Sequence, residues 1–128
     1  MNLDIKQNKI KKITSTDTIE VKINLILVLD VSGSMSSNSR LSNLKIVSKE
    51  MVKKLNLENS TVSIITFDSS ASTILSYSNN QSSIDSAINS LSASGGTSFL
   101  SAIGQTASFL QTSVNDKDNY VIFLSDGD

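Results

Sequence analysis

The chain has 128 residues, of which 38% are hydrophobic, enough for one domain, or part of one, with a real core. A formal net charge of −1 gives no support for nucleic-acid binding, which needs a basic surplus or stripe. Cysteine and histidine are absent, which excludes disulfides, thiolate sites, most zinc sites and a Ser-His-Asp triad. The amino terminus lacks an apolar signal segment, and no apolar run approaches the roughly 20 residues of a membrane span, which favours an intracellular protein.

The first half of the chain predicts a strand, a helix and a second strand. Residues 1–20 are polar and lysine-rich, and we expect an extension that precedes a domain at 21–128. The segment Ile23–Asp30 is almost entirely aliphatic before its aspartate, which is typical of a strand buried on both faces. A helix is predicted next, because apolar residues recur at steps of three and four: Leu41, Leu44, Val47, Met51, Val52 and Leu55. Its lysines are expected to face solvent: Lys45, Lys49, Lys53 and Lys54. The β-branched segment Thr61–Phe67 predicts a second strand, parallel to the first.

The second half predicts an edge strand, two helices and a fourth strand. Ala71–Leu75 follows closely and indicates an antiparallel edge strand. A short helix is expected over Ile84–Leu91, capped by Ser82 or Ser83. The next helix has this predicted apolar face: Phe99, Ala102, Ile103, Thr106 and Leu110. After a polar loop, the apolar run Tyr120–Leu124 predicts the last strand. The fold class is therefore α/β, a doubly wound and mostly parallel sheet with helices on both faces.

Oxygen-bearing side chains follow the predicted strands at comparable points. D-V-S-G-S at 30–34 puts one carboxylate and two hydroxyls, those of Asp30, Ser32 and Ser34, in a single tight turn. Thr97 follows two glycines in G-G-T-S at 95–98, and Asp126 follows the last strand in L-S-D-G-D at 124–128. In a doubly wound sheet, these segments can meet at the carboxyl edge, where such sheets bind ligands. A donor set made only of oxygen suits hard cations such as Mg²⁺ or Mn²⁺.

Each segment taken alone has an ordinary explanation. Because serine is abundant, the same D-x-S-x-S spacing recurs at 68–72, where a polar hairpin turn is the simpler interpretation. For the first turn, the alternative is a strand-to-helix loop in which Ser36 or Ser39 caps the helix. Thr97 alone fits a helix cap, and Asp126 alone fits a turn. The combination of all the segments is what indicates a metal site.

This ordered set resembles the von Willebrand factor A domain and its metal-ion-dependent adhesion site. That family carries Asp-x-Ser-x-Ser after the first strand, a threonine in a later loop and an aspartate after the fourth strand. The resemblance implies that Ser32 and Ser34 bind Mg²⁺ directly, with Mn²⁺ or Ca²⁺ as alternatives. It implies that Thr97 binds directly or through water, and that Asp30 and Asp126 mainly orient the bound waters and the serine hydroxyls. A protein partner would supply an Asp or Glu carboxylate as the remaining ligand.

The resemblance also bears on the extent of the chain and on rival functions. Full domains of that family add further strands, so we expect that 21–128 is the N-terminal portion of a domain and that more domains follow Asp128. One rival is a Mg²⁺-dependent phosphotransferase of the haloacid-dehalogenase type. Those enzymes need a second aspartate where this chain has Ser32, which cannot act as an acid or base near neutral pH. The other rival is a structural domain with a vestigial site. We expect a non-enzymatic protein-binding module.

Overall fold

The strand β1 (Ile23–Asp30) is the centre of the fold, and all eight of its residues are buried. The computed structural model describes residues 22–112 and 117–125. In it, β1 pairs in parallel with β2 (Thr61–Phe67) on one side and with β4 (Asp118–Leu124) on the other. The strand β3 (Ala71–Ser78) is antiparallel to β2, so the sheet order is β3-β2-β1-β4. The mostly parallel sheet with an antiparallel outer strand is confirmed.

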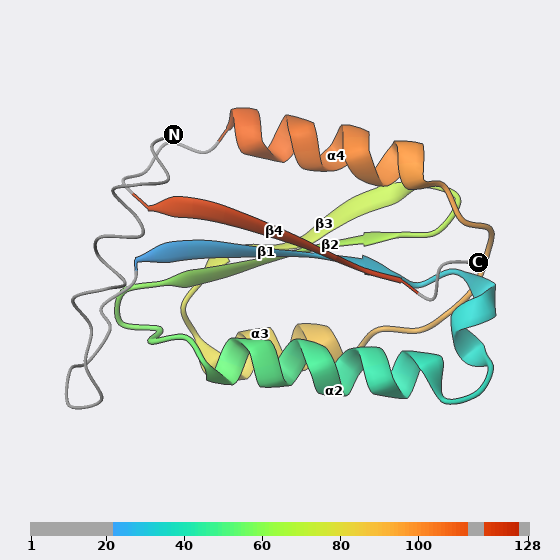
Figure 1. Ribbon diagram of the computed structural model, residues 1–128, viewed down its shortest axis with the longest axis horizontal. Helices are drawn as coiled ribbons and strands as arrows, with labels where there is room; N and C mark the ends of the chain where they lie inside the picture. The colour runs from blue at the N-terminus through green and yellow to red at the C-terminus, as the bar shows by residue number, and fades with distance from the viewer. Residues whose placement is uncertain (1–21, 113–116, 126–128) are drawn as a thin grey trace, which may run out of the picture.

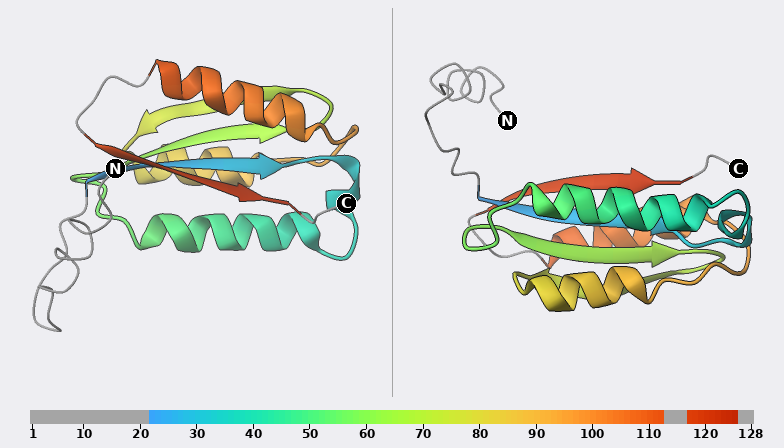
Figure 2. Two further views of the ribbon diagram at one scale, coloured as in Figure 1. Left: turned by 45° about the horizontal axis from the view of Figure 1, so that its top comes forward. Right: turned by 90° about the horizontal axis from the view of Figure 1, so that it is seen from below.

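Helices cover both faces of this sheet (Figure 1). The helices α2 (Arg40–Lys53) and α3 (Gln81–Asn89) lie on one face, and α4 (Phe99–Gln111) lies on the other, as Figure 2 also shows from two further directions. The doubly wound α/β architecture expected from the sequence is therefore confirmed. None of the helices within the described ranges is long and apolar enough to cross a bilayer. The predicted extension at 1–20 lies outside the described residues.

The alternation of side chains along β1 divides the core into two clusters. Leu25, Leu27 and Leu29 belong to the cluster under α2 and α3, whereas Ile26 and Val28 belong to the cluster under α4. Successive strand residues point to opposite faces, so an apolar residue is needed at nearly every position of a strand covered on both sides. Burying each of these side chains contributes about 1.5–3 kcal/mol. This explains why the strand needs an almost continuous apolar run.

The cap of α3 differs from the prediction. The helix begins at Gln81, and its cap is Asn80, whose side-chain oxygen accepts a hydrogen bond from the amide of Ser83 over 2.9 Å. Ser82 and Ser83 therefore lie inside the first turn and do not cap the helix. The sequence offers several good capping residues in a row, and only the path of the chain out of β3 selects among them.

The lysines of α2 contact the end of α3 as well as solvent. Lys45 donates to the main-chain carbonyl of Asn89 over 3.1 Å, and Lys49 donates to the side-chain oxygen of Asn89. A cation at the C-terminus of a helix is favourable because the last carbonyls carry partial negative charge. These two lysines are still partly solvated, and their contact with the end of α3 was not predicted from the sequence. Val47, predicted on the apolar face of this helix, is exposed and does not belong to the core.

Two apolar segments also differ in detail from their prediction. Ile103, expected on the buried face of α4, is 55% exposed, whereas Phe109, which lies outside the predicted face, is buried. β4 begins at Asp118, two residues before the predicted Tyr120, because Asp118 pairs with Ile23 at the start of β1. Pairing with a neighbour extends the strand into polar residues that carry no hydrophobic signal.

The topology places one crevice at the carboxyl end of β1. From β1 the chain passes through α2 to β2 on one side, and it returns through α4 to β4 on the other side. Open α/β sheets bind ligands at the point where the strand order reverses in this way. The segment that joins α3 to α4 also passes this end of the sheet (Figure 1). Side chains at this end are therefore the candidates for function.

Candidate functional site

Asp30, the last residue of β1, is fully buried, and both of its carboxylate oxygens accept hydrogen bonds. Its Oδ1 accepts from the amide of Ser32 over 2.8 Å and from the Ser32 hydroxyl over 2.5 Å. Its Oδ2 accepts from the hydroxyl of Ser125 over 2.6 Å. Ser125 directly follows β4, so this carboxylate joins the ends of two neighbouring strands. Hydroxyl donors to an ionised carboxylate form short, strong hydrogen bonds.

The turn after β1 holds two serine hydroxyls close together. The Oγ atoms of Ser32 and Ser34 lie 3.3 Å apart. The short helix η1 (Gly33–Ser36) follows at once, and Ser32 is also buried. Because the Ser32 proton is donated to Asp30, the lone pairs of its oxygen are directed elsewhere. Asp30, Ser32 and Ser34 are therefore brought together, as predicted.

The alternative explanation of this turn, in which Ser36 or Ser39 caps α2, is not found in the structure. Ser39 precedes α2 with φ 60°, and its side chain makes no capping hydrogen bond. The Ser36 hydroxyl donates to the main-chain carbonyl of Gly33 over 2.8 Å. The turn is thus closed by its own backbone and side chains and not by the helix cap.

The loop that carries Thr97 is attached to this turn through its backbone. The amide of Gly33 donates to the carbonyl of Gly95 over 2.8 Å, and the amide of Ser94 donates to the carbonyl of Val31 over 2.9 Å. Gly95 has φ +81°, a left-handed conformation that favours glycine. A Cβ on Gly33 would lie 3.2 Å from the Gly95 carbonyl oxygen, closer than most such contacts, so glycine at position 33 favours this approach.

Thr97 follows this attachment by two residues and is exposed. No hydrogen bond of its hydroxyl is found within the described ranges, and Ser98, its neighbour, caps α4 by accepting from the amide of Ser101 over 3.1 Å. Thr97 is therefore not the helix cap. Asp126, the remaining predicted residue, lies outside the described residues. Sequence reasoning did not identify Ser125, although it stands between the end of β4 and Asp126.

The chemistry of these residues suits a hard divalent cation. Every donor is an oxygen, and Mg²⁺ takes oxygen ligands and retains waters. Within the part of the chain that the structure describes, no cationic side chain pairs with the buried Asp30, and no group of three His, Cys, Asp or Glu side chains could hold a metal. A cation here would therefore be bound by neutral hydroxyls and water, with Asp30 supplying the nearby negative charge.

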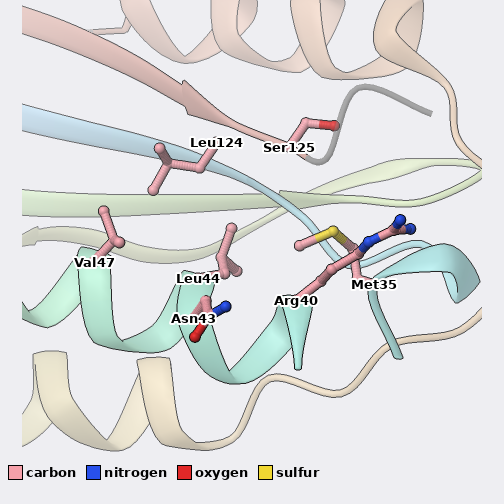
Figure 3. A pocket seen from close by; sticks show the side chains of 7 residues that line it. All are labelled: Met35, Arg40, Asn43, Leu44, Val47, Leu124 and Ser125. Carbon is pink, nitrogen blue, oxygen red and sulfur yellow. The ribbon is translucent and has the colours of Figure 1, made fainter. Parts of the chain in front are cut away.

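A hollow of about 240 Å³ lies beside this turn. Figure 3 shows that it lies between the start of α2 and the end of β4; its lining is Met35, Arg40, Asn43, Leu44, Val47, Leu124 and Ser125. Arg40 also donates to the carbonyl of Ser34 over 3.3 Å. Ser125, which follows β4 and donates to Asp30, thus forms part of the wall of this hollow.

Comparison with solved structures shows the same fold in bacterial proteins. The von Willebrand factor domain of the type V pilus tip protein Mfa5 from Porphyromonas gingivalis aligns with TM-score 0.76 and 21% identity, covering 86% of this chain and 39% of its own. BatB from Bacteroides thetaiotaomicron aligns with TM-score 0.68 and 26% identity, covering 79% and 52%. The PilB minor pilin from Streptococcus sanguinis aligns with TM-score 0.68 and 25% identity, covering 88% and 32%.

These values mean that the chain spans between about a third and a half of each of those proteins. No curated protein matched it. The sequence itself matches the von Willebrand factor type A domain over residues 25–128, most of its length. The carboxyl-edge turn, the sheet order and this match agree, and the chain belongs to the von Willebrand factor type A domain family.

Proposed function

We propose that this domain is a non-enzymatic binding module that recognises an acidic residue of a protein partner through a bound Mg²⁺. The ion would supply one coordination position, held by exchangeable water, that a partner carboxylate can take. Pilus tip and minor pilin proteins are among the proteins with this fold, which supports an adhesion or scaffold role. The proposal requires a bound metal ion. The residues proposed to hold this ion lie at the carboxyl end of β1.

The observation that carries the proposal is the buried Asp30 carboxylate with hydroxyl donors on both oxygens. Burying a carboxylate is costly unless it is hydrogen-bonded and its charge is compensated. Ser32 and Ser125 satisfy its hydrogen bonds but remain neutral. A cation held in front of Ser32 and Ser34 would compensate the charge without contacting Asp30 directly.

Each residue then has a defined task. Ser32 and Ser34 present hydroxyl oxygens toward the ion, and Asp30 fixes the Ser32 hydroxyl in the orientation that turns its lone pairs outward. Thr97 would provide a further oxygen from the adjoining loop, directly or through water, and Asp126 would mainly orient the bound waters. A site with this much neutral oxygen leaves most of the ion's charge uncompensated, which favours an anionic partner group.

The phosphotransferase alternative is disfavoured by the burial of Asp30. A nucleophilic carboxylate must reach the phosphorus of its substrate, whereas this side chain is 0% exposed and accepts hydrogen bonds on both oxygens. Ser32 also occupies the position of the expected acid or base. A structural domain with a vestigial site would have the same fold but would not bind the metal.

Isothermal titration calorimetry with Mg²⁺ tests the proposal against that last alternative. Ser34→Ala removes one proposed ligand and leaves the Asp30 hydrogen bonds in place. We expect its dissociation constant for Mg²⁺ to rise at least about tenfold, the scale on which loss of even a supporting group weakens metal sites. Ser37→Ala, an exposed serine three residues further on, is the matched control and should bind as the unaltered protein does. Absence of saturable Mg²⁺ and Mn²⁺ binding by the unaltered protein would refute the proposal.

A further inference from the structure

The loop that carries Thr97 is held from two directions. Its first half, Ser94 and Gly95, is bound to the turn after β1. Its second half is bound to the turn after β2: the amide of Gly96 donates to the hydroxyl of Ser69 over 3.0 Å, and the amide of Ser98 donates to the carbonyl of Asp68 over 2.6 Å. Thr97 lies between these last two donors. Its backbone is therefore fixed by the turn after β2, on which no predicted metal ligand lies.

That second turn is itself closed from both ends. The amide of Asp68 donates to the carbonyl of Ser70 over 2.8 Å, and the amide of Ser70 donates to the Oδ1 of Asp68 over 3.0 Å. A short turn with two internal hydrogen bonds is a firm support for a neighbouring loop. This turn is the D-x-S-x-S segment at 68–72, whose spacing repeats that of the proposed metal-binding turn.

The two loops also pack closely, and glycine makes this approach feasible. A Cβ on Gly96 would lie 3.1 Å from the Ser69 Oγ, and one on Gly95 would lie 3.5 Å from the Asp68 side chain. The contact is thus direct, with little room for the loop to move toward the turn. Asp68 contributes its main-chain carbonyl, which any substitution retains, whereas Ser69 contributes its side chain. Ser69 is therefore the residue through which the contact can be altered.

We propose that Ser69 is a positioning residue for Thr97, and that its hydrogen bond to Gly96 sets how well Thr97 serves the metal site. This inference rests on the proposed function, because it concerns the affinity of the same site. Ser69 is not among the residues proposed to hold the ion. Its effect passes through the Gly96–Ser98 backbone, so removing its hydroxyl lets Thr97 move without disturbing Asp30 and the serines of the first turn.

The first test measures the loop in the metal-free protein. Ser69→Ala should make the Gly96 amide exchange with deuterium several-fold faster in the presence of EDTA, because its acceptor is gone. Ser70→Ala is the matched control: within the described residues no hydrogen bond of the Ser70 hydroxyl is found, so the exchange of Gly96 should not change. Ser69→Thr retains a hydroxyl and should restore slow exchange. Equal exchange rates in Ser69→Ala and the unaltered protein would overturn the inference.

The second test measures Mg²⁺ affinity in a double-mutant cycle. Ser69→Ala should raise the dissociation constant about three- to tenfold, the range expected for one neutral hydrogen bond, and Ser70→Ala should leave it unchanged. In a Thr97→Ala background, Ser69→Ala should have no further effect, because there is no longer a threonine to position. An equal effect of Ser69→Ala with and without Thr97 would overturn the inference and leave the proposed function standing. Failure of the unaltered protein to bind Mg²⁺ would instead refute the proposed function, and this inference with it.

Discussion

The Ser125 hydroxyl donates to the Oδ2 of Asp30 over 2.6 Å, across 95 positions of sequence. This hydrogen bond joins the end of β4 to the end of β1, beside the hydroxyls of the first turn. It satisfies the oxygen that the turn itself leaves open, since Ser32 binds only Oδ1. The carboxylate is therefore shared between two strands of the sheet.

Removing this hydroxyl should destabilise the fold and weaken the site together. We expect Ser125→Ala to lower the free energy of unfolding by about 1–2 kcal/mol, because a buried carboxylate oxygen loses a donor. Urea unfolding in EDTA measures this effect apart from any bound metal. Ser108→Ala on the exposed side of α4 should change stability very little. A Ser125→Ala protein as stable as the unaltered one would show that water replaces the donor without loss.

Bound Mn²⁺ should retain exchangeable water in this site. Neutral hydroxyl ligands leave coordination positions for solvent, so the protein should enhance the relaxation of water protons by Mn²⁺. A short peptide with one glutamate should reduce that enhancement, and its glutamine counterpart should not, because only the carboxylate displaces water. Proton relaxation measured during each titration checks this. Equal behaviour of the two peptides would contradict a carboxylate-accepting position.

Two glycines offer a matched comparison of backbone effects. Gly95 has φ +81° and carries the carbonyl that binds Gly33, so Gly95→Ala should cost about 1–2 kcal/mol of unfolding free energy. Gly104 lies inside α4 with nothing within 4 Å of an added Cβ, and Gly104→Ala should stabilise by about 0.5–1 kcal/mol. Thermal or urea unfolding of both variants measures the difference. The prediction does not hold if both substitutions shift stability in the same direction.

The outer side of β4 should promote self-association of this chain. Among the described strands, β4 ends the sheet opposite β3, and Phe123 on it is 44% exposed. Exposed apolar side chains on an outer strand of a sheet favour association with another chain. We expect concentration-dependent association that Phe123→Lys reduces, measured by sedimentation velocity. A monodisperse unaltered protein at all concentrations would argue against this effect.

The sequence alone determined the central elements, because their signals are local. β2 has the predicted residues, and β1 covers the predicted apolar run that ends at Asp30. The buried positions of both strands follow from long runs of aliphatic and β-branched side chains. The turn at 30–34 was predictable because a carboxylate and two hydroxyls follow a buried strand within five positions. That set of residues also led to the von Willebrand factor A resemblance, which the family match confirms.

Only the tertiary structure decided which distant groups meet. The cap at Asn80, the contacts of Lys45 and Lys49 with Asn89, and the exposure of Ile103 all depend on neighbouring elements. The same holds for Ser125 on Asp30 and Ser69 on Gly96, where the partners are far apart in the chain. Spacing along a sequence fixes which residues share a face, but a hydrogen bond between two loops depends on how the folded strands bring their ends together.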